Sequence, residues 1–260
     1  MKIVSWNVNS VRTRLPTILE WFENARPDIA CLQEIKCQDE QFPRDAFEAL
    51  GYNIAVHGQK SYNGVAILSR YCIEESICGL PGNKDDDHAR YIEAVIGADN
   101  GPVRVASIYL PNGNPKGTDK FTYKLDWMKR LRAHAKSLLK LEEKLVLAGD
   151  YNVIYRDEDC WDPSVWADDA LFAKEVRDEF AALMWEGLTD AYLAKDGRAH
   201  QYTFWDYQRG AWQRGHGIHI DHILLSPQAA DTLQGVQIFK EARAMEKPSD
   251  HVPVMVELDA

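Results

Sequence analysis

Apolar and polar residues alternate along the chain in two rhythms, the two-residue period of strands and the 3.6-residue period of helices. Short β-branched or aromatic runs bounded by Gly, Pro, Asn or Asp predict nine or more strands. They lie at residues 2–8, 28–34, 63–70, 90–96, 103–111, 144–152, 201–207, 218–226 and 252–258. Helical spacing predicts helices at residues 10–24, 45–50, 118–141 and 167–185. Strands and helices therefore both recur along the whole sequence.

The longest helical pattern, at residues 118–141, carries a single apolar stripe. Its members are Leu125, Met128, Leu131, Ala135, Leu138 and Leu139. A helix with such a stripe packs one face on a sheet. We expect its Lys and Arg residues to remain in water.

The order of these elements predicts one domain, residues 1–260, because no Pro-rich, Gly-rich or repeated segment forms a linker. Strands follow one another both through turns and through helices, which fits a layered α/β sandwich better than a doubly wound sheet. The loop-like segments are residues 79–89, 111–118, 157–164 and 208–217. Within the first loop, the acidic run Asp85, Asp86 and Asp87 is expected to be solvated.

Composition and charge narrow the class of protein. Of the 260 residues, 45% are hydrophobic, which supplies a large core and excludes dominant disorder. No apolar run approaches the roughly 20 residues of a membrane span, and the first ten residues become polar too early for a signal peptide. Five cysteines without a CxxC pair argue against a disulfide framework and a structural zinc site. We therefore expect a soluble, cytoplasmic protein with reduced thiols and no membrane or obligate protein partner.

The net charge of −10 argues against a protein that coats nucleic acid through bulk charge. It leaves room for a local basic face beside an acidic, metal-filled pocket.

Polar side chains recur where the apolar runs stop. The residues in question are Asn7, Glu34, Tyr109, Asn112, Asp150, Asn152, Asp221, Asp250 and His251. In an α/β protein, side chains at strand ends and in the adjoining loops tend to line one rim of the sheet. Each residue alone indicates no more than a strand end, but together they form a set of carboxylate and amide oxygens with one histidine.

Such hard oxygen ligands favour Mg²⁺ or Mn²⁺ over zinc or copper. Magnesium is usually held by one or two carboxylates together with phosphate oxygens of a substrate, so a phosphate ester is the expected substrate class. The reaction also needs a base to activate water and donors for the phosphate oxygens. Asp150, His251 and Tyr109 are the residue types for those roles.

Eight segments of the chain form a distinctive series. In order, they are SWNVNSVR, PDIACLQEIK, NGVAILSR, YLPNG, LAGDYN, TFWDY, IDHILLS and EKPSDHVPV. Together they resemble the exonuclease III family of abasic-site endonucleases, and the resemblance covers residues 3 to 256. A smaller set (WN, QE, GDYN and SDH) would also fit the wider superfamily of deoxyribonuclease I, inositol polyphosphate phosphatases and sphingomyelinases. The resemblance implies a deoxyribonuclease I-like four-layer α/β sandwich, with two mixed sheets face to face and helices outside.

The activity that the resemblance implies is Mg²⁺-dependent hydrolysis of the phosphodiester 5′ to an abasic site in double-stranded DNA, leaving a 3′-hydroxyl. Mn²⁺ is the expected substitute metal, and 3′→5′ exonuclease and 3′-phosphodiesterase activities on 3′-blocked ends are further expectations. The cellular setting would be base excision repair at the nucleoid. A phosphatase or sphingomyelinase of the superfamily, or a DNA-binding module without activity, are the alternatives.

The resemblance also assigns roles to individual residues. Glu34 matches the metal carboxylate, with Asn7 and Asp250 nearby, and Asp150 and Asn152 are further metal candidates. Asn9 and Asp28 match supporting positions near the metal. Lys36 is expected to hold Glu34 in place. Asp150 matches the water-activating base, Asn152 the transition-state stabiliser, Tyr109 and Asn112 the contacts to the scissile phosphate, and His251 the phosphate-facing histidine oriented by Asp221. Phe204, Ile218 and Ile220 match a small apolar sugar pocket and are equally compatible with core positions.

The sequence departs from the family at His219, where an arginine is common. The segment 208–217 supplies Arg209, Trp212 and Arg214, which we interpret as a DNA-facing patch that contacts phosphates without reading sequence. The DNA-penetrating side chains stay open, because Gln208 and Asn114 fall in variable loops. The number of metal ions and the group that protonates the leaving oxygen also stay open.

Overall fold

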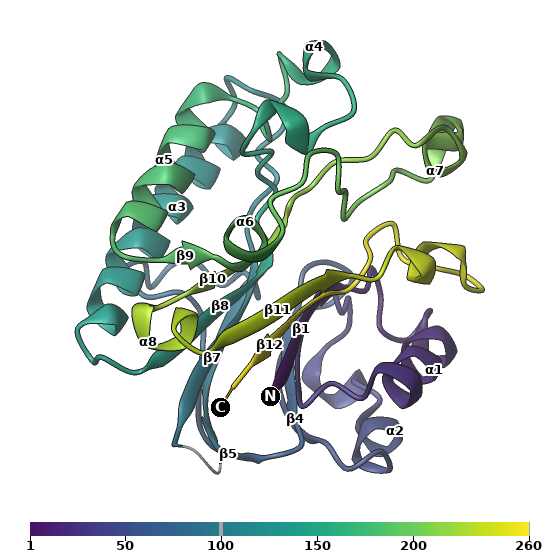
Figure 1. The fold of residues 1–260 in the computed structure, drawn as a ribbon, viewed down its shortest axis with the longest axis vertical. Helices are drawn as coiled ribbons and strands as arrows, with labels where there is room; N and C mark the ends of the chain where they lie inside the picture. The colour runs from purple at the N-terminus through teal and green to yellow at the C-terminus, as the bar shows by residue number, and fades with distance from the viewer. Residues whose placement is uncertain (99–100, 260) are drawn as a thin grey trace.

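Two six-stranded sheets lie face to face in the structure, a computed structural model that describes residues 1–98 and 101–259 (Figure 1). The first sheet has the order β11 (Leu233–Ile238), β12 (Val254–Leu258), β1 (Lys2–Asn7), β2 (Ile29–Gln33), β4 (Val65–Ser69) and β3 (Asn53–His57). The second has the order β5 (Cys72–Cys78), β6 (Tyr91–Gly97), β7 (Val103–Tyr109), β8 (Lys144–Asp150), β10 (Asp221–Leu225) and β9 (Thr189–Asp190). Both sheets are mixed, because β1–β2 and β7–β8 are parallel while their other pairs are antiparallel.

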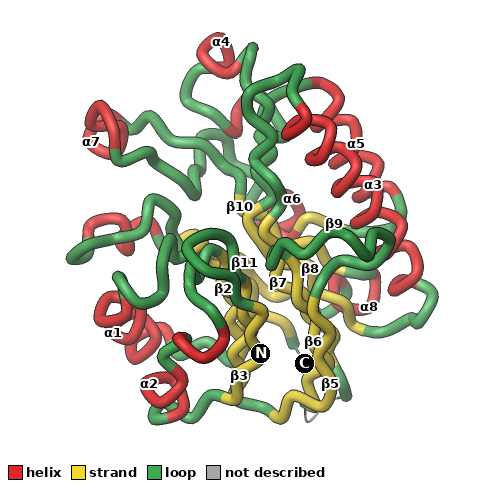
Figure 2. The backbone as a smooth tube through the Cα atoms, turned by 180° about the vertical axis from the view of Figure 1, so that it is seen from behind, coloured by secondary structure: helices red, strands yellow, loops and turns green. Residues whose placement is uncertain are grey.

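Helices cover the outer faces of the sheets. Helices α1 (Leu15–Ala25) and α2 (Arg44–Glu48) lie outside the first sheet, and α3 (Asp119–Leu139) and α5 (Lys174–Trp185) outside the second (Figures 1 and 2). The remaining α-helices are the short α4 (Pro163–Trp166), α6 (Ala191–Lys195), α7 (Ala211–Arg214) and α8 (Pro227–Ala230), and 3₁₀ turns occur at Asp39–Gln41, Asp157–Asp159, Gln208–Gly210 and Lys240–Ala244. The four-layer α/β sandwich expected from the sequence is confirmed.

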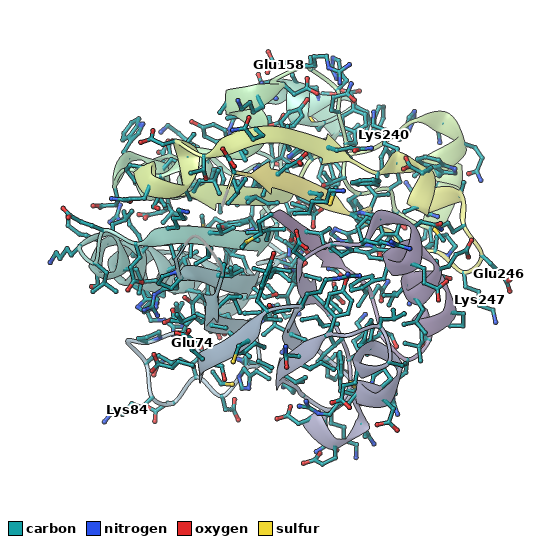
Figure 3. All side chains as sticks on the ribbon, turned by 60° about the horizontal axis from the view of Figure 1, so that its bottom comes forward. Glu74, Lys84, Glu158, Lys240, Glu246 and Lys247 are labelled. Atoms are coloured by element: carbon teal, nitrogen blue, oxygen red, sulfur yellow. The ribbon has the colours of Figure 1, made fainter. Side chains whose placement is uncertain are left out.

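The strand periodicity explains the layers. In β1, Ile3 packs between the two sheets, whereas Val4 and Trp6 pack under α1. A strand buried on both faces places successive side chains on opposite sides, so β1 contributes to two hydrophobic clusters. Charged side chains such as Glu74, Lys84, Glu246 and Lys247 extend outward at the periphery (Figure 3).

The prediction of a strand at residues 201–207 is wrong. That aromatic segment is a loop, in which Phe204 makes only isolated bridges to Ile218 and His251. β-Propensity reflects fit to a half-buried pleated surface. Here Tyr202 and Trp205 pack in the hydrophobic core from a loop, and Phe204 lines a cavity. Conversely, the sequence pattern missed β3, β5, β9 and β11; β5 is mostly exposed and therefore lacks the apolar alternation of a core strand.

Two helices begin later than predicted. Helix α1 begins at Leu15 and has Pro16 in its first turn, a position that suits the fixed φ of proline. Helix α5 begins at Lys174, and residues 167–173 form a loop instead of its first two turns.

The long helix α3 buries one of the lysines that were expected to remain in water. Met128, Leu131, Ala135 and Leu138 are buried as predicted, but Lys124 is buried as well, with no exposed surface. Its position four residues before Met128 places it on the apolar stripe. Its ammonium Nζ donates to the carbonyl oxygens of Asn112 (3.0 Å) and Asn152 (2.6 Å), so it is satisfied by the loops above the helix rather than by water.

The acidic run is only partly solvated. Asp85 and Asp87 are exposed, whereas the Asp86 side chain is 5% exposed and pairs with Arg130 of α3. The Tyr123 hydroxyl also donates to Asp86, at 2.9 Å. The middle carboxylate therefore anchors this loop to α3.

Among the described residues, no helix is both long and apolar enough to cross a membrane. All five cysteines have free thiols; Cys72 and Cys78 are exposed and Cys31, Cys37 and Cys160 are buried.

Candidate active site

The polar residues at the strand ends meet at one edge of the sandwich because of strand direction. The parallel strands β1 and β2 end at Asn7 and just before Glu34, and the parallel strands β7 and β8 end at Tyr109 and Asp150. The antiparallel strand β10 begins at the same edge, with Asp221 paired to Asp150. Asp250 and His251 precede β12, which runs antiparallel to β1, so they reach this edge too.

Asn7 connects two carboxylates at the centre of this edge. Its Nδ2 donates to Glu34 Oε1 at 2.8 Å and to Asp150 Oδ2 at 2.9 Å. Lys36 Nζ lies 2.8 Å from the other oxygen, Glu34 Oε2. Glu34 and Asp150 are thus held at fixed positions by neutral and cationic donors.

The two carboxylates differ in acidity. Burial would raise the pKa of Glu34, but the charge of Lys36 and the hydrogen bonds from Asn7 and Lys36 outweigh it and lower the pKa. Burial raises the pKa of Asp150 well above its usual value, although the positive charge of His251 opposes the shift.

His251 is oriented by Asp221. Its Nδ1 lies 2.9 Å from Asp221 Oδ2 and 3.1 Å from Oδ1, so the ring presents Nε2 toward Asp150, 3.7 Å from Oδ2. Burial alone would lower the pKa of His251, but the charges of Asp221 and Asp150 raise it. His251 is therefore an imidazolium at neutral pH, with one N–H directed into the site.

Tyr109 and the two amides Asn112 and Asn152 also belong to the site. Burial, followed by the charges of Glu34 and Asp150, raises the pKa of Tyr109 well above its usual range, so the phenol keeps its proton. The guanidinium of Arg90 lies over the Tyr109 ring at 4.7 Å. Asn112 Nδ2 donates to Asn152 Oδ1 at 3.3 Å, and Asn152 Nδ2 donates to the Leu110 carbonyl at 2.9 Å.

The loop before β12 joins the site through Asn9. Its Nδ2 donates to Asp250 Oδ1 at 3.0 Å, and its Oδ1 accepts from Lys36 Nζ at 2.6 Å. Asn9 therefore connects Asp250 to the pair formed by Lys36 and Glu34.

These residues open into a cavity of about 310 Å³. Its polar lining includes Glu34, Tyr109, Asn112, Asp150, Asn152, Asp250 and His251, and its apolar lining includes Phe204, Ile218 and Ile220. Phe204 is half-buried and its ring lies 4.9 Å from the His251 ring. The structure thus brings the predicted apolar residues beside the predicted polar ones.

Asp28 does not belong to this site, contrary to the expectation from the sequence. It precedes β2 and accepts from the backbone N–H of Lys2 at 2.7 Å, whereas Glu34 follows the same strand. Five strand residues at about 3.3 Å each separate the two carboxylates by roughly 17 Å or more. Asp28 therefore supports the start of the strand pair β1–β2.

His219, where an arginine was expected, faces away from the cavity. It is buried, its Nδ1 lies 2.8 Å from the Gln201 carbonyl, and its ring packs at 4.8 Å from that of Tyr192. Burial lowers its pKa. A neutral ring packed among aromatic residues replaces the charged contact of the family pattern.

The sequence argument missed several lining residues, namely Asn114, Trp166, Asp169 and Leu171. Asn114 holds two of them together, because its Nδ2 donates to Asp169 Oδ1 at 3.0 Å and its Oδ1 accepts from the Ala170 N–H at 2.9 Å. Asn114 lies 55 positions before Asp169, and Trp166 ends the short helix α4. Neither strand ends nor helical spacing marked them.

The donor set fits a hard divalent cation. Glu34, Asp150 and His251 each place a ligand atom within 4.8 Å of the others. Because His251 is an imidazolium bonded to Asp221, the carboxylate oxygens are the groups able to hold a metal ion. Oxygen donors of this kind are those that Mg²⁺ and Mn²⁺ prefer.

The fold and this site together define a phosphoester hydrolase, and comparisons with known proteins agree. The chain belongs to the Endonuclease/Exonuclease/phosphatase family, whose model matches residues 4–251. It is 31% identical to exodeoxyribonuclease III of Haemophilus influenzae over 99% of both chains.

Two solved structures are similar over their full length. The 3′ phosphatase NExo from Neisseria, bound to a product DNA hairpin, has a TM-score of 0.96 and 39% identity, covering 100% of both chains. An AP endonuclease from Archaeoglobus fulgidus has a TM-score of 0.94 and 32% identity, again covering 100% of both chains. The protein is therefore a nuclease of the exodeoxyribonuclease III and AP endonuclease type.

Proposed function

We propose that this DNA repair nuclease hydrolyses the phosphodiester 5′ to an abasic site in double-stranded DNA and leaves a 3′-hydroxyl. Removal of nucleotides and blocking groups from 3′ ends is part of the proposal. In each of these reactions the bond between phosphorus and a 3′ oxygen breaks, and a 3′-hydroxyl remains. The observation that carries it is the cavity of about 310 Å³, in which two carboxylates and an oriented imidazolium face a small apolar wall. Such a nuclease would act at the nucleoid, in the cytoplasm.

Asp150 is the proposed general base. Its raised pKa makes it a better proton acceptor than an ordinary carboxylate, and Asn7 fixes its Oδ2. It takes a proton from a water molecule, whose oxygen then attacks phosphorus in line with the leaving 3′ oxygen. Base catalysis of this kind contributes roughly 10²- to 10⁴-fold.

His251, Asn112 and Asn152 are the proposed donors to the phosphate oxygens. The His251 imidazolium is held by Asp221 before substrate binds, so it stabilises negative charge without reorganising. The Tyr109 phenol keeps its proton and is available as a donor to the leaving oxygen.

We propose that Glu34, with Asp150, Asn7 and Asp250 close by, holds Mg²⁺ or Mn²⁺. When bound, the metal would supply positive charge that neutralises the phosphate and the leaving oxygen. Lys36 and Asn7 position the Glu34 carboxylate for that purpose.

The apolar wall accounts for the choice of an abasic nucleotide. A nucleotide without a base has lost its stacking and pairing, so moving it out of the helix costs less than flipping an intact one. Phe204, Ile218 and Ile220 then offer apolar contact to a bare deoxyribose.

The test is a cleavage assay with Mg²⁺ on four substrates: a duplex with an internal tetrahydrofuran abasic analogue, a duplex with a 3′-phosphate, an undamaged duplex and an inositol polyphosphate. We expect cleavage of the abasic duplex and of the blocked end. Cleavage of the 3′-phosphate alone would restrict the enzyme to 3′ ends; the Neisseria relative is named a 3′ phosphatase. Hydrolysis of the inositol phosphate without any cleavage of DNA would contradict the proposal.

A further inference from the structure

A second and larger cavity adjoins the active site. It has a volume of about 510 Å³, within the range of about 300–1,000 Å³ typical of small-molecule sites. We call it the aromatic pocket and define it by Trp161, Trp166, Phe204, Arg209, Arg214 and His216. Trp166, Phe204, Asp206 and Ile218 line both cavities, so the two are adjacent.

The walls of the aromatic pocket come from two segments that project from the same end of the molecule, around α4 and α7 (Figures 1 and 2). Trp161 and His216 stack face to face across them, with ring centroids 3.7 Å apart and planes 8° from parallel. The stack covers one face of the Trp161 indole and fixes its orientation at the border of the cavity. Trp166 adds a second indole, whose Nε1 is buried without a hydrogen-bond partner among the described residues.

The rim carries two exposed arginines and one exposed aspartate, Asp206. Arg209 and Arg214 are exposed, and among the residues that the structure describes neither guanidinium is paired with a carboxylate. Flat aromatic faces, an unused N–H donor and free guanidinium groups match the chemistry of a nucleotide, which has a stacking base, base-edge acceptors and a phosphate.

We propose that the aromatic pocket binds the nucleobase of a 3′-terminal nucleotide while that nucleotide's 5′ phosphate occupies the active site. This inference rests on the proposed function and deepens it, because it assigns a binding place to the base of a nucleotide that is removed from a 3′ end. The deoxyribose lies against Phe204 and Ile218, which both cavities share, and the base continues past Phe204 toward Trp161. A frayed end can place its base there, whereas an internal base must first leave its stack and its pairing partner.

The chemistry of the step is the hydrolysis already described. The bond between phosphorus and the 3′ oxygen of the preceding nucleotide breaks, water supplies the new oxygen on phosphorus, and the product is a nucleoside 5′-monophosphate. The same product is therefore a probe of the pocket that does not depend on turnover.

The first measurement is binding of dAMP and of 2-deoxyribose 5-phosphate, two probes that differ only in the base, by calorimetry. We expect dAMP to bind more tightly, and Trp161→Ala to remove about fivefold or more of that preference, as expected for a lost stacking partner. Trp161→Phe should restore part of it. The matched control is Trp185→Ala, because Trp185 is 83% exposed at the end of α5 and lines neither cavity.

The second measurement is kcat/KM on a recessed duplex with a 3′-terminal dA and on the duplex with an internal tetrahydrofuran site. Trp161→Ala should slow the first reaction at least fivefold and leave the second unchanged. Equal binding of dAMP and 2-deoxyribose 5-phosphate to the wild-type protein, or an unchanged preference in Trp161→Ala, would overturn the inference. Loss of both reactions in the wild-type protein would instead contradict the proposed function, and the binding comparison would still decide the role of the pocket.

Discussion

The Asn7 amide donates to both Glu34 and Asp150, but the surroundings of the two carboxylates shift their pKa values in opposite directions. Glu34 has a 17% exposed side chain and an ammonium partner in Lys36, so it stays ionised. Asp150 is buried against Asp221, and its raised pKa keeps it ready to accept a proton. Two carboxylates with pKa values pushed in opposite directions are typical of a site that gives them different roles, which fits the proposed metal carboxylate and the proposed base.

Glu34→Ala should reduce activity mainly by weakening metal binding, because a magnesium ion with few protein ligands loses much of its anchoring with one carboxylate. We expect the Mg²⁺ concentration for half-maximal activity to rise at least tenfold, and higher Mg²⁺ or added Mn²⁺ to recover part of the rate. Metal titrations of kcat/KM measure this. Wild-type activity of the variant at low Mg²⁺ would remove Glu34 from this role.

Asp150→Asn keeps the shape of the side chain and removes the base. Turnover should fall by roughly 10²- to 10⁴-fold, while the Kd for abasic duplex changes little, because Asp150 makes no proposed contact with flanking DNA. Single-turnover kinetics and a binding titration separate the two effects. If the variant keeps wild-type turnover, another group is the base.

Phe204 lies at the boundary between the two cavities. Phe204→Ala should merge them and admit bulkier nucleotides, so cleavage of intact duplex should rise severalfold relative to abasic duplex. The ratio of kcat/KM for the two duplexes is the measurement, with metal dependence as the internal control. An unchanged ratio in a normally folded variant would make Phe204 a core residue only.

At the scale of elements, a buried ion pair joins β9 to β10. His222 Nδ1 lies 2.9 Å from Asp190 Oδ2, and the other ring nitrogen lies 3.2 Å from the Val153 carbonyl, so both ring nitrogens act as donors. Asp190 also caps α6 through the N–H of Leu193. Burial opposes both charges, but the pair raises the pKa of His222 and lowers that of Asp190.

This pair predicts a pH-dependent contribution to stability. The pKa of His222 is higher in the folded protein than its unfolded value of about 6.5, so its contribution to stability is complete below about pH 6.5. That contribution disappears as the pH rises through the folded pKa. The lowered pKa of Asp190 contributes above its unfolded value of about 3.8 and is lost as pH falls through the folded value. The pair therefore contributes most between about pH 4 and pH 6.5.

His222→Gln should accordingly cost about 3 kcal/mol or more in the free energy of unfolding at about pH 5.5, since it leaves a buried carboxylate without its cation. The cost should fall as the pH rises through the raised pKa of His222, because the imidazolium of the wild-type protein then loses its proton. Urea unfolding over a series of pH values from about pH 5.5 upward measures it. A cost that does not vary with pH would show that His222 carries no charge in the folded protein.

At the scale of the whole molecule, an acidic protein must bind a polyanion. The net charge of −10 repels DNA at long range, so contacts near the active site have to supply the attraction. The exposed Arg209 and Arg214 on the projecting α7 segment are the cations in the best position to do so (Figure 1).

Replacing Arg209 or Arg214 with Ala should weaken DNA binding equally for all sequences. The slope of log K against log salt concentration should become shallower by about 0.9 for each phosphate that the variant no longer neutralises. Binding titrations between about 50 and 200 mM salt, the range over which this dependence is usually read, would measure it. Lys140→Ala is the control, because Lys140 is exposed at the C-terminal end of α3. An unchanged slope in both arginine variants would place the DNA elsewhere.

Most strands, the layered class and the polar residues at the strand ends could be predicted from the sequence, because hydrophobic periodicity and the residues that interrupt it are local properties. The sequence also contained enough to reject Asp28, since a strand of five residues must separate Asp28 from Glu34. Three features became visible only in the folded molecule: the burial of Lys124, the hydrogen bond from Asn114 to Asp169, and the stack of Trp161 on His216. Each of these depends on segments distant in sequence meeting in space, and no local pattern encodes which loops will pack together.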